Sequence, residues 1–174
     1  MKAVMLSVQP KWCGLIASGK KTVEVRKTKP KLDVPFKVYI YCTNDRKLQF
    51  WTNKRYSYAD DHSHNLFDRC GNGKVIGEFI CDTMVVDKTY GHDPMFREMA
   101  CMSQVEAASY CLNAKMYGWH ISELKIYDEP KQLGEFKRCH KCEYYSKCYE
   151  HEYSCSGVYK LTRPPQSWCY VEEA

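Results

Sequence analysis

The stretch GKKTVEVR at residues 19–26, near the start of the chain, places three cationic side chains around one acid, Glu24. Alternate residues of a strand share a face, so Thr22, Glu24 and Arg26 would point to one side. Lys21 and Arg26 can donate to a phosphate or a base edge, and Glu24 can accept from an amino group or hold the lysine in place. The alternative is an edge strand whose charged face is solvated.

The same residues have the chemistry of a small hydrolytic site. A lysine whose pKa is lowered by burial and by neighbouring cations, here Lys20 and Arg26, can act as a base or activate a nucleophile. Glu24 or His120 would then carry the proton. The candidate catalytic residues are therefore Lys21 and Glu24.

Four cysteines lie within one polar, tyrosine-rich stretch: Cys139, Cys142, Cys148 and Cys155. A pair separated by two residues can clamp a metal through a tight turn, and two further thiolates complete a tetrahedron. The stretch has little apolar core, so a structural zinc would supply its folding free energy, on the order of 10 kcal/mol. An iron–sulfur cluster, or free thiols and disulfides, are the alternatives, and His140 and His151 are substitute ligands.

The other seven cysteines are scattered singly, and we expect them to be small buried hydrophobes.

The stretch DDHSH at residues 60–64 contains residue types that can bind a metal, but they are adjacent in a polar segment, so we interpret this stretch as a solvated turn. It lies within residues 44–73, a long excursion that mixes aromatic and basic residues. Such long loops are functional or disordered more often than structural.

The elements that position these groups follow from periodicity. Alternation over residues 4–8 predicts a half-buried first strand, Pro10 begins a short helix, and Gly19 ends it before the strand at 22–26. Ser103 and Glu106 have the spacing of a capping box, which predicts a helix to about Leu112. Further strands are expected at residues 38–42, 74–86 (with a bend at Gly77), 118–127 and 157–162.

Strand parity adds two candidates to the site. In the strand at residues 118–127, His120 and Ser122 share a face with Leu124 and Ile126. This face begins polar and ends apolar, as expected where a core opens into a pocket. We therefore expect His120 and Ser122 to line one pocket with the charged residues of strand 22–26. The alternative is a histidine and a serine that are simply satisfied at a strand end.

Charge and composition narrow the function classes. The net charge is +5, but residues 1–31 hold eight Lys or Arg residues against the single acid Glu24. Such a basic segment is typical of a protein that binds polyanions, although it also suits a solubilising surface. No stretch approaches the ~20 apolar residues of a membrane span, and the start lacks the apolar core of a signal peptide. We expect a cytoplasmic protein with no membrane partner, whose cysteines are reduced or bind metal.

The stretch QPKWCGLIASGKKTVEVR at residues 9–26 resembles the signature of the ASCH domain, a barrel related to the PUA fold. That signature is a short helix followed by G-x-K-x-x-E-x-R entering a strand, and Gly19, Lys21, Glu24 and Arg26 match all four positions. The GKVIGEF and GVYKLT strands also fit, so the resemblance covers most of residues 1–135 and 157–174.

The resemblance implies an α+β fold: one PUA-like domain over residues 1–174, a small mixed β-barrel with two or three short helices. Residues 136–156 would be a Cys-rich, zinc-knuckle-like insertion. It also implies a binding site for RNA, a nucleotide or a modified nucleoside in a basic cleft at the barrel mouth. Besides the residues above, Trp12 and Trp51 would offer stacking faces. Because the family's ends lie near its cleft, the rim would add Gln166, Ser167 and Trp168.

Some ASCH-like proteins are amidohydrolases on acylated cytidine, and some are ribonucleases. In the amidohydrolases the lysine of the signature works with a threonine, where this chain has Glu24, and with a downstream glutamate, for which Glu98 and Glu106 are approximate counterparts. A third interpretation makes the Cys-rich segment a surface for a protein partner.

If the charged residues form a site outside the packed core, replacing Lys21 or Arg26 with alanine should change the free energy of unfolding by less than about 1 kcal/mol.

Overall fold

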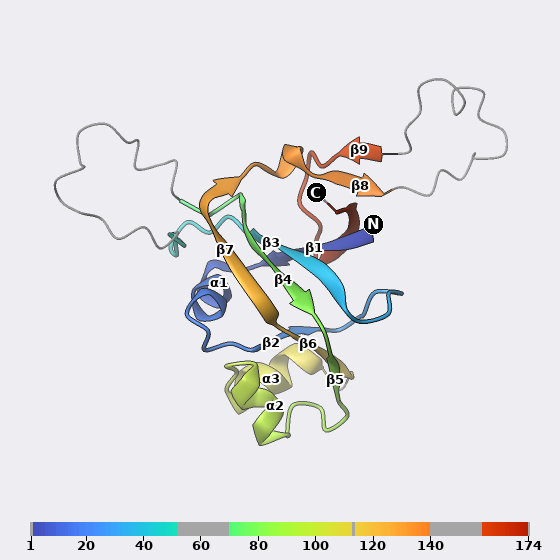
Figure 1. Ribbon diagram of the computed structural model, residues 1–174. Helices are drawn as coiled ribbons and strands as arrows, with labels where there is room; N and C mark the ends of the chain where they lie inside the picture. Colours follow the sequence, from blue (N-terminus) through green and yellow to red (C-terminus); the bar gives the residue numbers. More distant parts are fainter. Residues whose placement is uncertain (1, 52–69, 113, 140–157, 174) are drawn as a thin grey trace.

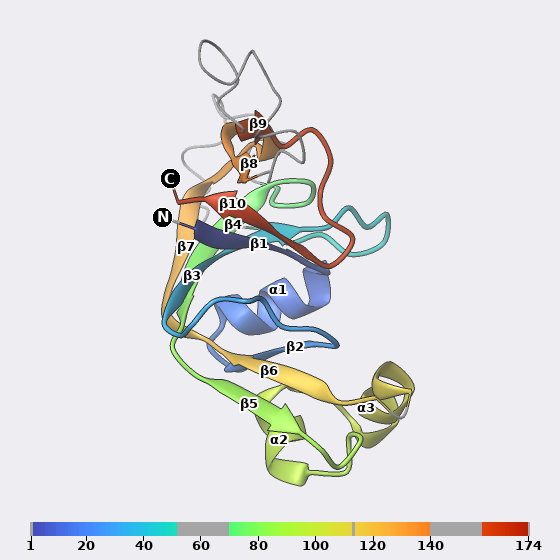
Figure 2. The same ribbon diagram turned by 90° about the vertical axis from the view of Figure 1, so that its right-hand side faces the viewer.

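The computed structural model describes residues 2–51, 70–112, 114–139 and 158–173. Its strands form a seven-stranded sheet in the order β7-β4-β3-β1-β10-β8-β9 and a three-stranded sheet in the order β2-β6-β5. Figures 1 and 2 show the two sheets with α1 between them and with α2 and α3 below the smaller one. The α+β class is confirmed.

The strands are β1 (Lys2–Val8), β2 (Val23–Arg26), β3 (Phe36–Cys42), β4 (Val75–Cys81), β5 (Met84–Asp87), β6 (Met116–His120), β7 (Ser122–Lys131), β8 (Lys137–Cys139), β9 (Val158–Lys160) and β10 (Trp168–Glu172). The helices are α1 (Pro10–Ala17), α2 (Pro94–Met99), α3 (Gln104–Cys111) and a 3₁₀ turn at Leu133–Glu135. No helix among the described residues is long and apolar enough to cross a membrane.

The first strand is central in its sheet rather than half-buried. β1 pairs parallel with β3 and antiparallel with β10. Val4 and Leu6 pack into the core cluster around α1, whereas Ala3 and Met5 pack into a second cluster on the opposite face. Both faces of β1 are apolar because both are covered.

Two predicted strands are each broken in two by a change of sheet. The strand expected at residues 74–86 is interrupted after Cys81, so that β4 belongs to the larger sheet and β5 to the smaller. The strand expected at residues 118–127 breaks at Ile121 between β6 and β7 in the same way. A bend is predicted at Gly77, and the β4–β7 register shifts between Val75 and Gly77. A side chain at this glycine would clash with the backbone oxygen of Lys125.

The helices follow the local signals where those signals exist. Pro10 occupies the first turn of α1, and Gly19 has the left-handed φ of 72° that ends the helical segment. The capping box of α3 is present, with Ser103 and Glu106 each bonded to the other's backbone N–H. α2, capped by Asp93, was not predicted. Together α2 and α3 cover Val23 and Val25 of β2.

Candidate functional site

The three charged residues of the opening motif are buried. The exposed fraction is 3% for Lys21, 5% for Glu24 and 9% for Arg26. β2 is an edge of the smaller sheet, but α1 lies on one side of it and α2 and α3 on the other (Figure 2). The alternative of a solvated edge strand is therefore wrong, because helices pack over β2 although it is the edge strand of its sheet.

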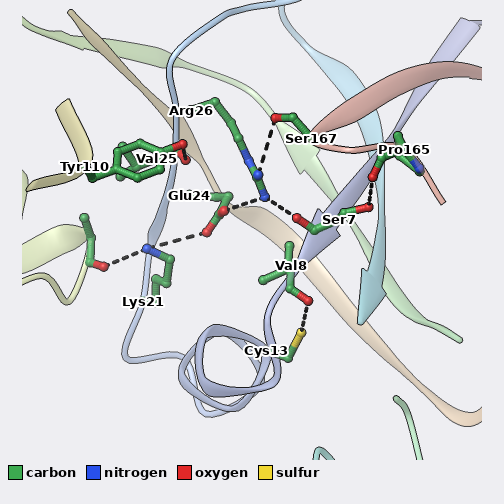
Figure 3. A network of polar contacts seen from close by, with 11 residues as sticks. Ser7, Val8, Cys13, Lys21, Glu24, Val25, Arg26, Tyr110, Pro165 and Ser167 are labelled. Atoms are coloured by element: carbon green, nitrogen blue, oxygen red, sulfur yellow. Dashed lines mark hydrogen bonds and ion pairs between the residues drawn. The ribbon is translucent and has the colours of Figure 1, made fainter. Parts of the chain in front are cut away.

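Glu24 links the two cations into one network, drawn in Figure 3. Its Oε1 lies 2.8 Å from Arg26 Nη2, and its Oε2 lies 3.5 Å from Lys21 Nζ. One carboxylate thus faces two buried cations, and the group keeps a net positive charge. Buried charges are tolerated only when they are paired and hydrogen-bonded, as here.

Arg26 ties β2 to two distant segments. Its Nη2 donates to the backbone oxygen of Ser7 at 2.6 Å, and its Nη1 donates to Ser167 Oγ at 3.5 Å. The Ser7 hydroxyl in turn donates to the backbone oxygen of Pro165 at 2.6 Å. The buried Nε of Arg26 has no hydrogen-bond partner among the described residues. Three contacts thus fix the position of this guanidinium, and its Nε is unpaired within the described part of the chain.

Lys21 reaches across to the segment between α2 and α3. Its Nζ donates to the backbone oxygen of Ala100 at 2.6 Å and lies 4.8 Å from the centre of the Trp12 ring. Burial lowers the pKa of the Lys21 amine, and the nearby Glu24 carboxylate opposes part of that change. The amine is therefore easier to deprotonate than an exposed lysine.

The lowered pKa predicts an alkaline rise in stability. Below its folded-state pKa, Lys21 is protonated in both states, and the folded protein bears the full cost of burying the charge. As pH rises from that value toward the ordinary 10.5, the folded amine loses its proton first, so this cost disappears. The unfolding free energy of the wild type minus that of Lys21→Met should therefore increase from neutral pH to about pH 10, measured by urea unfolding. A flat difference would mean that the folded-state pKa is not lowered.

The network opens onto a cavity of about 320 Å³. The cavity is lined by Ser7, Val8, Gln9, Trp12, Lys21, Glu24, Val25, Arg26, Thr43, Met102, Tyr110 and Gln166. Its volume is at the lower end for ligand pockets, which suits one small molecule or one base rather than a length of chain. Tyr110 is fixed by its hydroxyl, which donates to the backbone oxygen of Val25 at 3.3 Å.

Comparison with known proteins identifies the fold that carries this site. The profile of the ASCH domain matches residues 6–164. The chain belongs to the ASCH domain family. The resemblance of residues 9–26 to the family signature is thereby confirmed, and the matched range includes residues 136–156. No curated protein sequence matches the chain.

Solved structures show the same fold at low sequence identity. A crystal structure of ASCH from Zymomonas mobilis is 17% identical, with a TM-score of 0.60 over 98% of this chain and 88% of that one. A serine-to-alanine variant of the Zymomonas mobilis protein is 17% identical, with a TM-score of 0.61 over 98% and 89%. A tyrosine-to-phenylalanine variant is 19% identical, with a TM-score of 0.56 over 99% and 92%.

Within the ASCH fold, the predicted ligand contacts separate into two groups. Trp12 and Gln166 line the cavity. Ser167 contacts Arg26 but is not among the lining residues. Trp168 instead packs against Trp119, with ring centres 6.0 Å apart, and donates to Thr28 Oγ1 at 3.0 Å. Trp51, which is 42% exposed, and Thr22, which is exposed, are not among the lining residues.

The structure does not bring His120 and Ser122 to this cavity. His120 Nδ1 lies 2.6 Å from Asp82 Oδ1, and Ser122 Oγ donates to the backbone oxygen of Ile80 at 2.9 Å. The expected shared pocket is wrong because Ile121 separates two strands of different sheets, so parity does not carry across it. The hydrogen bond of Asp82 to His120 lowers the pKa of the carboxyl, as for an ordinary surface pair.

Several lining residues had no signal in the sequence. Ser7 and Tyr110 lie in a strand and a helix that look structural. Ala100 does not line the cavity, but its backbone oxygen accepts from Lys21. Met102 is partly buried against the cluster that contains Val23 and Val25. These contacts depend on which distant segments meet, and local patterns do not report that.

The predicted metal site lies outside the described residues. Three of its four cysteines, Cys142, Cys148 and Cys155, fall in the range 140–157, which the structure does not describe. The stretch DDHSH also lies outside the described residues, in the range 52–69. Within the described parts of the chain, no group of three or more His, Cys, Asp or Glu side chains is arranged to hold a metal ion. The other seven cysteines are free thiols, and five are buried as expected: Cys13, Cys42, Cys81, Cys111 and Cys169.

Proposed function

We propose that this ASCH domain binds RNA or a nucleotide by accepting a single base or nucleoside, unmodified or modified, in the cavity beside Lys21, Glu24 and Arg26. ASCH domains are PUA-like and in general bind RNA. The observation that carries the proposal is a buried, hydrogen-bonded charge network that borders an open cavity. Burying three charges costs desolvation free energy, and a recognition site can use such charges as pre-oriented partners for a ligand.

The lining offers complementary chemistry to a base. Lys21 and Arg26 present donors, and Glu24 presents an acceptor for an amino group. Trp12 and Tyr110 supply aromatic walls on which a base can stack, a contact that is worth about 1–3 kcal/mol in other RNA-binding proteins. The amide of Gln166 at the rim can both donate and accept.

Exposed lysines of the first segment would contact phosphates. Lys11, Lys20, Lys27, Lys29 and Lys31 are all exposed. Two of them lie beside aromatic lining residues: Lys11 Nζ is 4.4 Å from the Trp12 ring centre, and Lys27 Nζ is 5.2 Å from that of Tyr110. These cations would form the basic rim of the cleft.

The test is a screen of common and modified ribonucleosides and of short single-stranded RNAs, scored for both binding and turnover. Phosphate contacts release counterions, so RNA affinity should fall with salt. Three such contacts would give a loss of about 20-fold between about 50 mM and about 200 mM salt. Neutral nucleosides are the internal control, because their affinity should hardly change. RNA affinity that ignores salt, or no binding at all, would contradict the proposal.

A second candidate is a small hydrolase that uses the same cavity. The lowered pKa of Lys21 favours it, because a neutral amine can take a proton from water or from a substrate. Glu24, 3.5 Å from Lys21 Nζ, would hold that amine or transfer the proton. N-acylated nucleosides and short RNAs are the substrates to try. If Glu24 transfers a proton, Glu24→Gln should cut turnover by ~100-fold or more while binding survives.

For the Cys-rich segment, we retain structural zinc as a proposal, on the spacing of Cys139, Cys142, Cys148 and Cys155. The purified protein should carry close to one equivalent of zinc by elemental analysis. Chelation should release it and expose four additional thiols, because metal binding is the expected source of this segment's folding free energy. Absence of metal, with freely titratable thiols, would refute the site, and visible absorption would indicate an iron–sulfur cluster instead.

A further inference from the structure

An ion pair spans the two helices that flank the cavity. Lys11 Nζ on α1 lies 2.6 Å from Glu106 Oε1 on α3, and both side chains are well exposed. Lys11 is next to Trp12, which lines the cavity from α1. On the other helix, Tyr110 lies one turn beyond Glu106 and also lines the cavity, so both residues share a face of α3. The pair therefore bridges the rim between α1 and α3.

Each member of the pair is also held by a contact of its own. Glu106 is the acidic residue of the α3 capping box, and its Oε2 accepts from the backbone N–H of Ser103 at 2.9 Å. Its carboxylate would stay in place if Lys11 moved. The ammonium of Lys11 rests 4.4 Å from the Trp12 ring centre, so it would stay near the cavity without Glu106.

The carboxylate is charged at any working pH. The hydrogen bond with Lys11, helped by those of Ser103, lowers the pKa of Glu106 to about 2. An exposed ion pair contributes little stability, so an incoming anion can exchange for one partner at small cost. A phosphate at the rim would attract Lys11 and be repelled by Glu106.

We propose that Lys11 is the phosphate contact at the cavity rim and that Glu106 is the competing carboxylate that a ligand's phosphate must displace, which makes this pair the determinant of whether the site prefers nucleosides or nucleotides. The inference rests on the proposed function, because it assumes that a nucleoside occupies the cavity. In this inference, the Glu106 carboxylate repels phosphate-bearing ligands and takes no part in catalysis.

The experiment measures the affinities of the four common ribonucleosides and of their 5′-monophosphates at low salt. Glu106→Gln removes the charge but keeps the capping hydrogen bond, since glutamine also serves at this position. It should strengthen monophosphate binding about fivefold and leave nucleoside binding unchanged, the scale expected for one exposed charge pair. Lys11→Met should weaken monophosphate binding by a similar factor and leave nucleosides unaffected.

The double variant and a remote control separate the explanations. In the Lys11→Met background, Glu106→Gln should strengthen monophosphate binding much less than in the wild type, because the Lys11 ammonium that it would release is missing. Lys2→Met makes the same charge change at the far end of β1 and should alter neither ligand class. Two results would overturn the inference. One is that Glu106→Gln strengthens monophosphate binding as much in the Lys11→Met background as in the wild type, and the other is that Glu106→Gln does not strengthen it at all. If no variant binds any nucleoside or nucleotide, the proposed function itself fails.

Discussion

Replacing Glu24 with glutamine is expected to lower the free energy of unfolding by about 3 kcal/mol, the scale for breaking a buried ion pair. Glutamine keeps the size of the side chain and one acceptor oxygen. However, Lys21 and Arg26 would then be two buried cations without a counter-charge. The new amide can be oriented in two ways, and in either one its NH₂ group faces Lys21 or Arg26, which are themselves donors. Urea unfolding at neutral pH measures the loss.

A compensating substitution provides the control for this result. Adding Lys21→Met to Glu24→Gln removes one of the two uncompensated charges, so the double variant should regain a substantial part of the lost stability. Coupling of this kind is expected only between groups in contact. If Glu24→Gln were as stable as the wild type, the charges would be screened by water, and the network would not be the buried one described above.

The second large effect concerns binding. Lys21→Met should weaken nucleoside or RNA binding by roughly 30-fold or more, as expected for losing a charged hydrogen-bond donor in a buried site. Stability should change by less than about 1 kcal/mol, because a buried ion is replaced by an apolar side chain of similar shape while Glu24 keeps Arg26 as its partner. Isothermal titration and urea unfolding measure the two quantities on the same preparation.

The neighbouring lysine is the matched control for that variant. Lys20 is exposed, so Lys20→Met makes the same charge change outside the cavity. It should weaken binding only by the small amount that one cation at the rim contributes. A loss of binding as large as that of Lys21→Met would mean that overall charge, and not the cavity, governs affinity. Unchanged binding in Lys21→Met would remove the cavity from the proposed function.

Local chemistry predicted the part of the site that one stretch of chain supplies. Pro10 and Gly19 mark the ends of the first helical segment, so the position of Lys21, Glu24 and Arg26 directly after it could be read from the sequence. The capping box at Ser103 likewise fixed the start of α3, which places Tyr110 at the cavity. In each case a few adjacent residues determine the backbone.

The burial of the charges could not be predicted, because it depends on segments that meet only in the folded chain. Alanine substitution of Arg26 was expected to be nearly neutral for stability, but this side chain bonds to Ser7, Glu24 and Ser167, and its removal should cost well over 1 kcal/mol. Strand parity failed at His120 for a related reason, since the change of sheet at Ile121 has no signal in residue type.

The pairing of β1 with β10 has a consequence for how the protein is made. Lys2 lies opposite Glu172 and Leu6 opposite Trp168, so a ribosome completes one strand long before its partner exists. At ordinary elongation rates the delay is roughly 10 to 30 seconds. During it, β1 has one open edge that other chains can join, and the contact from Arg26 to Ser167 cannot form. The nascent chain therefore cannot complete the candidate site until translation has reached β10.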